Sequence, residues 1–239
     1  MSHPLGPNDA RNADMFAADA EGKQASFVYL VSAVAAVGGF LFGYDLSIIS
    51  GAIIFLKKAF ALGAWAEGFA VSSAFLGCMA GPVIGSSFSD RMGRKKTLMF
   101  AAILFGAGAI GTAAATDMVV FNLFRILGGV GVGLASVVSP MYIAEISPAR
   151  IRGRLVTINQ LAIVTGSLCS IAVSYYLAKN EHWRWMFASA LVPVIALMIG
   201  LVLIPESPRW LVQKGKIEEA LRILVRVDGK KAAQQEIQE

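Results

Sequence analysis

The stretch that decides the fold is residues 27–56, "FVYLVSAVAAVGGFLFGYDLSIISGAIIFL", in which Asp45 is the only charged side chain. A helix needs about 20 mainly apolar residues to cross the hydrocarbon core of a bilayer. The stretch is long enough and apolar enough for such a helix. It therefore predicts a membrane-spanning segment that carries one carboxylate in its interior.

Five more apolar blocks follow this first one along the chain. The chain is 56% hydrophobic and only 15% charged, whereas soluble domains carry about a quarter charged residues. Because lipid cannot satisfy free backbone groups, the blocks must be helices. We predict an all-α polytopic membrane protein whose six helices, as three plus three, are compatible with an inverted repeat. The blocks are 27–56, 67–88, 97–116, 119–143, 155–178 and 185–204.

The positive charge of the chain is distributed unevenly among the loops. Sixteen of the 21 Lys and Arg fall in the N-terminal tail, the loops after the second and fourth blocks, and the C-terminal tail. Such asymmetry is the positive-inside signal, so we expect both termini to be cytoplasmic in a multi-pass protein of the cell (inner) membrane. The net charge of +5 thus indicates topology and does not indicate nucleic-acid binding.

Composition also divides the chain into three parts. Residues 1–26 are polar and contain four acidic side chains, unlike the basic start of a signal peptide. They are expected to form a cytoplasmic tail before a six-helix bundle at 27–205. Residues 206–239 are expected to begin an intracellular helical domain, with an amphipathic helix marked by apolar residues at helical spacing: Ile217, Ala220, Leu221, Leu224 and Val225.

Asp45 and Arg125 are the only ionisable residues well inside the six blocks. An isolated charge at mid-membrane costs about 3 kcal/mol on insertion scales, so we expect the two to pair. In one interpretation Asp45 is a proton site: Arg125 favours the ionised carboxylate when close, and a conformational change that parts them allows protonation. In the other, they form a fixed ion pair that only holds two helices together.

No pattern in the sequence indicates an enzyme, a metal site or a cofactor. Cys78 and Cys169 lie inside apolar blocks without metal-ligand spacing and are interpreted as small buried residues. The glycine-rich run "GGVGVG" at 128–133 lies within a membrane block, whereas a nucleotide-binding loop would follow a strand.

Several motifs resemble the sugar porter family of the major facilitator superfamily, in particular its bacterial proton-coupled xylose and hexose symporters. The resemblance implies the N-terminal half of a twelve-helix transporter that works by alternating access. In that family an aspartate at the position of Asp45 marks proton symporters. The matching motifs are "GGFLFGYD" (38–45), "DRMGRKK" (90–96), "RILGGVGVGLASVVSPMYIAEISPARIRG" (125–153), "NQLAIVTG" (159–166), "WRWMF" (183–187) and "PESPRW" (205–210).

The resemblance also implies a cytoplasmic gating network of charged residues. Asp90 is expected to cap the third helix or to pair with Arg94, and the alternative is a solvated basic loop that only sets topology. The family usually has glycine where this chain has Ser86. The network implied by the resemblance comprises Asp90, Arg91, Arg94, Glu145, Arg152, Glu206 and Arg209.

Polar side chains at helical spacing in the fifth block are the candidate sugar contacts: Thr157, Gln160, Ser167 and Ser174. Amide groups donate and accept hydrogen bonds, as sugar hydroxyls do, and Gln160 resembles the sugar-binding glutamine of the family. Ser167 stands where monosaccharide porters commonly have a second glutamine. Phe42 resembles an aromatic residue of the sugar cavity. The alternatives are interhelical hydrogen bonding for the polar residues and a lipid-facing position for Phe42.

The resemblance covers only the first half of such a transporter, so the predicted partners include a second half. A homodimer and a separate C-terminal half both remain open, together with a sugar substrate, a proton and the bilayer. An inactive truncated half is a further alternative. A membrane sugar receptor or regulatory subunit is a different class of function, and the retention of Asp45 favours transport over it.

Overall fold

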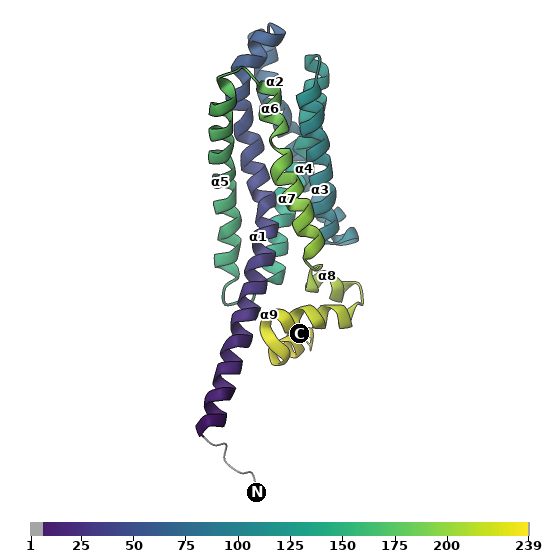
Figure 1. The fold of residues 1–239 in the computed structure, drawn as a ribbon. Coiled ribbons are helices and arrows are strands. Elements are labelled where there is room, and N and C mark those ends of the chain that lie inside the picture. Colours follow the sequence, from purple (N-terminus) through teal and green to yellow (C-terminus); the bar gives the residue numbers. More distant parts are fainter. Residues whose placement is uncertain (1–6, 239) are drawn as a thin grey trace.

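The computed structural model describes the backbone of residues 7–238 and the side chains of residues 24–227. The described residues form helices and no strand, which confirms the predicted all-α class (Figure 1). The helices are α1 (Pro7–Phe60), α2 (Ala64–Met92), α3 (Arg94–Ala114), α4 (Met118–Ile146), α5 (Arg152–Ala178), α6 (Trp183–Ala188), α7 (Leu191–Leu203), α8 (Pro208–Gln213) and α9 (Ile217–Gln238).

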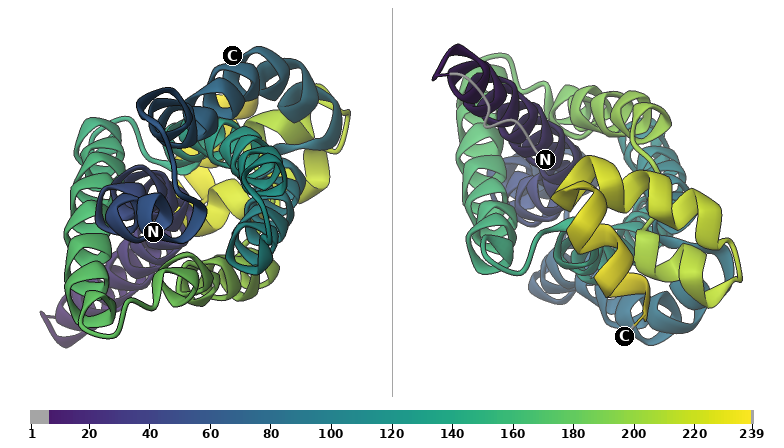
Figure 2. Two further views of the ribbon diagram at one scale, coloured as in Figure 1. Left: turned by 90° about the horizontal axis from the view of Figure 1, so that it is seen from above. Right: turned by 90° about the horizontal axis from the view of Figure 1, so that it is seen from below.

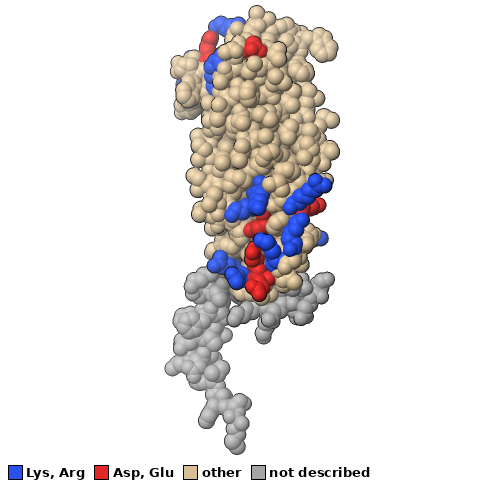
Figure 3. Space-filling model, turned by 90° about the vertical axis from the view of Figure 1, so that its right-hand side faces the viewer, with Lys and Arg blue, Asp and Glu red and all other residues tan. Residues whose placement is uncertain are grey.

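Six segments of the described chain are long and apolar enough to cross a membrane, as predicted. They run side by side in alternating directions (Figure 1), and the face shown in Figure 3 has an uncharged band between two charged ends. The first span starts at Gln24, inside α1, whose helix begins well before the apolar block. The spans are Gln24–Phe60, Ala64–Met92, Arg94–Ala114, Met118–Ile146, Arg152–Ala178 and Trp183–Leu203.

The sixth span differs from the prediction because it is two helices, α6 and α7, separated at Ser189 and Ala190. Pro193 lies three residues beyond the break and has no backbone N–H to donate to the carbonyl of Ser189. That carbonyl instead accepts from the backbone N–H of Val192 at 3.1 Å, a tighter turn than the α-helix makes. The proline therefore explains the break, which the hydrophobicity of the block did not indicate.

Helices α1 and α5 approach each other closely at two glycines. A Cβ atom at Gly43 would collide with the backbone carbonyl of Ile163, and one at Gly166 would collide with that of Phe40. In each helix the obstructing carbonyl belongs to the residue three positions before the glycine of that helix. Such contacts are how helices associate tightly in lipid.

Helices α2 and α4 repeat this arrangement. A Cβ at Gly129 would collide with the carbonyl of Ala74, and one at Gly77 with that of Ile126, again three positions before a glycine. Because α1 and α5 run in one direction and α2 and α4 in the other, the two contacts are related as the halves of an inverted repeat. The repeat is therefore visible in the packing, although sequence identity did not reveal it.

The charged connections gather at one end of the bundle. The N-terminal part of α1, together with α8 and α9, lies at the same end (Figures 1 and 2), and α9 begins at Ile217, where the amphipathic helix was predicted. Of the Lys and Arg residues with described side chains, those at the opposite end are Lys57, Lys58, Lys179 and Arg184. The asymmetry read from the sequence is thus an asymmetry of the folded bundle.

Candidate functional site

Asp45 and Arg125 face each other inside the bundle, from α1 and α4. The Nη1 atom of Arg125 donates a hydrogen bond to Oδ1 of Asp45, and each residue is only 4% exposed. Burial removes both ions from bulk solvent, so such a pair depends on its mutual attraction. The structure therefore brings together the two charges that the sequence placed in different spans.

The pair is not fully satisfied by its hydrogen bonds. Oδ2 of Asp45 and both Nε and Nη2 of Arg125 are buried without a hydrogen-bond partner. A cavity of about 10 Å³ lies beside them, lined by residues of α1, α3, α4 and the α6–α7 region, and is about the smallest space that admits one water molecule. Oδ2 of Asp45 can thus still take up a proton, and the unpartnered atoms of both residues can still hydrogen-bond to a water molecule.

The second close partner of Arg125 is an aromatic ring. The Cζ atom of Arg125 lies 5.5 Å from the centroid of the Phe187 ring, within the range of a cation–π interaction. Edge-to-face contacts fix the Phe187 ring against Phe121 at 5.5 Å and Trp183 at 6.4 Å. In the sequence Phe187 stands out only as part of the motif "WRWMF", since nothing in its spacing connects it to Arg125.

The break in the sixth span lies next to this pair. The hydroxyl groups of Tyr44, which precedes Asp45, and of Ser189, at the break, are 2.6 Å apart and share a hydrogen bond. Ala190 lines the same small cavity as Asp45 and Arg125. The irregular part of the sixth span is thus fixed to the helix that carries the buried carboxylate.

The polar residues of the α5 stripe differ in how deeply they are buried. Gln160 and Thr157 are exposed, whereas Ser167 is half-buried and Ser174 is buried against Gly51 of α1. A spacing of seven residues falls about 20° short of full helical turns, so the stripe drifts from the open face toward α1.

Two of these residues are already engaged within the protein. The Thr157 hydroxyl donates to the carbonyl of Gly153 at 2.9 Å, and the Ser167 hydroxyl donates to the carbonyl of Gly43 at 3.1 Å. The interhelical interpretation therefore fits Ser167. Phe42 is partly buried and packs on the apolar core, which leaves its predicted place in a sugar cavity untested.

Gln160 and Ser174 have no such hydrogen bond, and of these two only Gln160 is exposed. It is exposed within an apolar span, and its side chain has no hydrogen-bond partner among the described residues. An amide that faced hydrocarbon without a partner would cost about 4 kcal/mol or more. Its face is therefore better suited to a polar cavity or a protein partner than to lipid.

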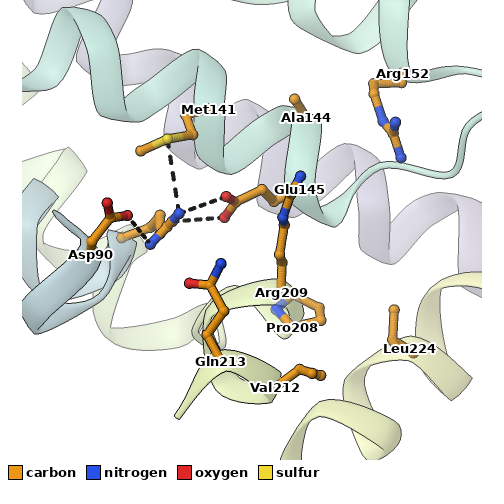
Figure 4. Close-up of a pocket in the computed structure, with 11 residues that line it drawn as sticks. Asp90, Met141, Ala144, Glu145, Arg152, Pro208, Arg209, Val212, Gln213 and Leu224 are labelled. Carbon is orange, nitrogen blue, oxygen red and sulfur yellow. Dashed lines mark hydrogen bonds and ion pairs between the residues drawn. The ribbon is translucent and has the colours of Figure 1, made fainter. Parts of the chain in front are cut away.

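Arg94 is the centre of the charged network at the α8 end of the bundle. Its Nε and Nη2 atoms donate to the two carboxylate oxygens of Glu145, both at 2.8 Å, and Nη1 lies 3.2 Å from Asp90 (Figure 4). The same carboxylate of Glu145 accepts from the Ser207 hydroxyl at 2.6 Å. These contacts join the second, third and fourth spans to the segment that follows the sixth.

Glu206 contacts Arg94 through the backbone. Its Oε1 atom accepts from the backbone N–H groups of Arg94 at 2.8 Å, Lys95 at 3.0 Å and Ser207 at 2.9 Å. It thus caps the N-terminus of α3, where a negative charge is favoured by the helix dipole. Asp90 was expected either to cap α3 or to pair with Arg94, and the structure shows the pair.

Three arginines of the implied network stand apart from it. Within the described part of the chain, Arg91, Arg152 and Arg209 form no ion pair, and Arg152 donates only a long hydrogen bond of 3.4 Å to the carbonyl of Ser147. Arg152 and Arg209 nevertheless line a cavity of about 930 Å³ beside Arg94 and Glu145 (Figure 4). These two arginines therefore lie beside the charged network but form no ion pair with its described residues.

The fold and the site together define an integral membrane protein with a buried ion pair between spans and a charged network at one end. The chain belongs to the family described as "Sugar (and other) transporter", whose model matches residues 31–239. Since the family model covers most of the chain, the resemblance drawn from the motifs is confirmed.

The relatives are named as transporters. The chain is 40% identical over 248 residues to the D-xylose-proton symporter of Escherichia coli, covering 90% of this chain and 50% of the relative. It is 41% identical over 219 residues to the arabinose-proton symporter of Bacillus subtilis, covering 88% and 47%. These relatives are not enzymes, in agreement with the sequence analysis.

Solved structures give the same result. The proton:xylose symporter XylE bound to 6-bromo-6-deoxy-D-glucose matches with a TM-score of 0.86 and 38% identity, over 90% of this chain and 52% of that one. A partially occluded inward-open conformation of XylE from E. coli matches with a TM-score of 0.85 over 89% and 58%. The chain spans about half the length of the relatives it matches, and its six spans have the fold of one half of the major facilitator superfamily.

Proposed function

We propose that the chain acts as the N-terminal half of a proton-coupled sugar transporter, most simply one for a monosaccharide, that works by alternating access. The observation that carries the proposal is the buried contact between Asp45 and Arg125. Relatives named as proton symporters of xylose and arabinose support the same conclusion.

Asp45 is the proposed proton carrier and Arg125 its modulator. While Arg125 contacts Asp45, the positive charge favours the ionised carboxylate. When rearrangement of α1 relative to α4 parts the two, the buried carboxylate is stabilised by taking up a proton, because an unpaired charge in the interior is costly. Binding on one side of the membrane and release on the other would couple transport to the proton gradient.

Gln160 is the best candidate for a sugar contact. Its exposed amide lies on an open face of α5 at membrane depth and is free to donate and accept. Thr157, one turn away on the same face, and Phe42 are further candidates. Ser167 is proposed to support the sugar site through its hydrogen bond to the carbonyl of Gly43, which links the sugar-facing helix α5 to the helix of Asp45.

The network around Arg94 is the proposed gate at the cytoplasmic end. Ion pairs between loops can form and break as helix bundles rock against each other. Asp90, Arg94 and Glu145 supply the existing pairs, and Glu206 anchors the third helix. Arg91, Arg152 and Arg209 are then available to acidic groups of a second six-helix half.

The proposed location is the cell membrane, with both termini and the segment 206–239 on the cytoplasmic side. The concentration of basic residues at the α8 end supports this orientation. Residues 1–26 would form the cytoplasmic tail and 27–205 the membrane bundle. The second half would come from another copy of the chain or from a separate C-terminal half.

The first test is the mass of the purified chain in lipid nanodiscs, measured by native mass spectrometry. A dimer would support a self-sufficient pair, and a monomer would support a half that requires a separate partner. Uptake of labelled D-xylose into proteoliposomes is then measured with and without a pH gradient, for the chain alone or with that partner.

The decisive variant is Asp45→Asn, with Glu67→Gln as a control in the partly exposed ion pair with Lys57, at the end of the bundle away from α8. We expect Asp45→Asn to abolish gradient-driven uptake while sugar binding persists, and Glu67→Gln to change neither. Uptake that ignores the pH gradient would overturn proton coupling. Sugar binding without any uptake, in every assembly tested, would favour the receptor alternative.

A further inference from the structure

We propose that Phe187 is a positioning residue for the proton site: its ring is the partner that retains the Arg125 guanidinium when Asp45 is protonated. The inference rests on the proposed role of Asp45 as the proton carrier. It assigns to the sixth span a part in proton coupling that lies outside the helices carrying the ion pair.

The geometry gives Arg125 two partners on different elements. Nη1 contacts Asp45 of α1, and the guanidinium lies over the Phe187 ring of α6 at 5.5 Å. Nε and Nη2 have no hydrogen-bond partner, and Arg125 is only 4% exposed. Once Asp45 becomes neutral, the ring is therefore the remaining group beside the cation with an electron-rich face.

The described residues that line the small cavity show which charged groups face the Arg125 guanidinium. Of the described residues that line the cavity around the pair, Asp45 and Arg125 are the only ionisable ones. From α2, Cys78 lies within electrostatic reach of both, and the Tyr44 hydroxyl of α1 is engaged by Ser189. A cation–π interaction is stronger in a desolvated site than on the surface, so the ring influences when Asp45 takes up its proton.

The ring is held in place independently of Arg125. Phe121 and Trp183 contact it edge to face, and Phe187 is 2% exposed. Phe121 belongs to α4, the helix that carries Arg125. The ring is thus packed against the helix of the guanidinium and stays beside it when α1 and α4 rearrange.

The test is pH-difference infrared spectroscopy of the full chain in lipid nanodiscs, which follows the C=O band of the protonated Asp45 carboxyl. The band is identified by its loss in Asp45→Asn. Without the ring, Arg125 depends more on the Asp45 carboxylate, so protonation becomes harder. We expect Phe187→Leu to shift the pH profile of the band to lower pH by about one unit.

Three further variants distinguish the effect of the aromatic ring from the effect of its volume. Phe187→Tyr keeps an aromatic face and should keep the wild-type profile. Phe187→Met fills the space without a ring and should shift the profile as Phe187→Leu does, which provides a second test if the leucine variant fails to fold. Phe105 lines the same cavity without contacting the guanidinium face, so Phe105→Leu should leave the profile unchanged.

The outcomes distinguish this inference from the proposed function. A titrating Asp45 band that is unchanged in both Phe187→Leu and Phe187→Met would overturn the role of the ring alone. An equal shift in Phe105→Leu would do the same, since it would reduce the effect to packing. A wild-type chain without an Asp45 band at any pH would overturn the proton site, and this inference with it.

Discussion

The carboxylate of Glu206 occupies the space that a side chain at Gly93 would need. A Cβ atom at Gly93 would collide with Oε2 and lie 2.8 Å from the carboxyl carbon, and the backbone at Gly93 has a φ of +95°. The glycine of "DRMGRKK" and the glutamate of "PESPRW" therefore form one close contact. This contact packs the start of α3 against the end of the sixth span.

The first prediction concerns this contact. Gly93→Ala introduces both a collision with Glu206 and an unfavourable positive φ, which costs on the order of 1–3 kcal/mol before the collision is counted. We expect a lower midpoint of thermal unfolding in detergent or nanodiscs. Gly153→Ala is the matched control, since nothing lies within 4 Å of its added Cβ. Equal midpoints for the two variants would contradict a stabilising contact between Gly93 and Glu206.

The second prediction separates the charge of Glu206 from its hydrogen bonds. Glu206→Gln keeps one acceptor oxygen for the start of α3 but removes the charge, and we expect a loss of about 0.3–1 kcal/mol. Glu206→Ala leaves the N–H groups of Arg94, Lys95 and Ser207 without this acceptor, and we expect a larger loss of about 1–3 kcal/mol. The measurement is chemical unfolding at low and high salt. An alanine variant as stable as the glutamine variant would refute the capping role.

The third prediction concerns the buried ion pair. Arg125→Leu or Asp45→Leu leaves one uncompensated charge in the interior, and each should destabilise the bundle by about 3–5 kcal/mol. The double variant removes both charges and should recover much of that loss. A double-mutant cycle on unfolding in nanodiscs measures the coupling. The exposed pair Lys58 and Glu181 at the opposite end is the control, with an expected coupling of no more than about 1 kcal/mol. Additive losses at Asp45 and Arg125 would show that they do not depend on each other.

The fourth prediction concerns the close approach of α1 and α5. Gly43→Ala pushes a methyl group into the backbone carbonyl of Ile163 and must separate the helices or distort them. We expect strong destabilisation and weaker sugar binding, because Gly43 also accepts from Ser167. Gly68→Ala, in a helix with open space around the added Cβ, should be neutral or slightly stabilising. A Gly43→Ala chain as stable as Gly68→Ala would be inconsistent with this packing.

The fifth prediction concerns Gln160. Because its exposed side chain has no partner among the described residues, Gln160→Ala should leave stability within about 0.5 kcal/mol. Loss of one or two hydrogen bonds to a sugar should weaken binding by about tenfold. Isothermal calorimetry with D-xylose on the assembly that binds sugar is the direct measurement. A large loss of stability would show that Gln160 is structural, and unchanged affinity would remove it from the sugar site.

The candidate site was only partly accessible from the sequence. Asp45 and Arg125 were identified because charges inside apolar blocks are costly and therefore need partners. Phe187 and Ser189 gave no such signal, since an aromatic residue and a serine are unremarkable in a membrane span. The cap formed by Glu206 was also missed, because its partners are backbone N–H groups that have no sequence signature.

What the sequence by itself determined is the class of the protein: six apolar spans, their order along the chain, and the two charges inside them. These follow from the solubility of each segment in lipid, which depends on local composition. What only the tertiary structure decided is which groups meet. The Phe187 ring over Arg125, the Tyr44 bond to the broken sixth span and the Glu206 cap at Gly93 join residues that are distant along the chain. Such contacts depend on how helices rotate and approach, and that is fixed by packing between segments rather than by the composition of any one of them.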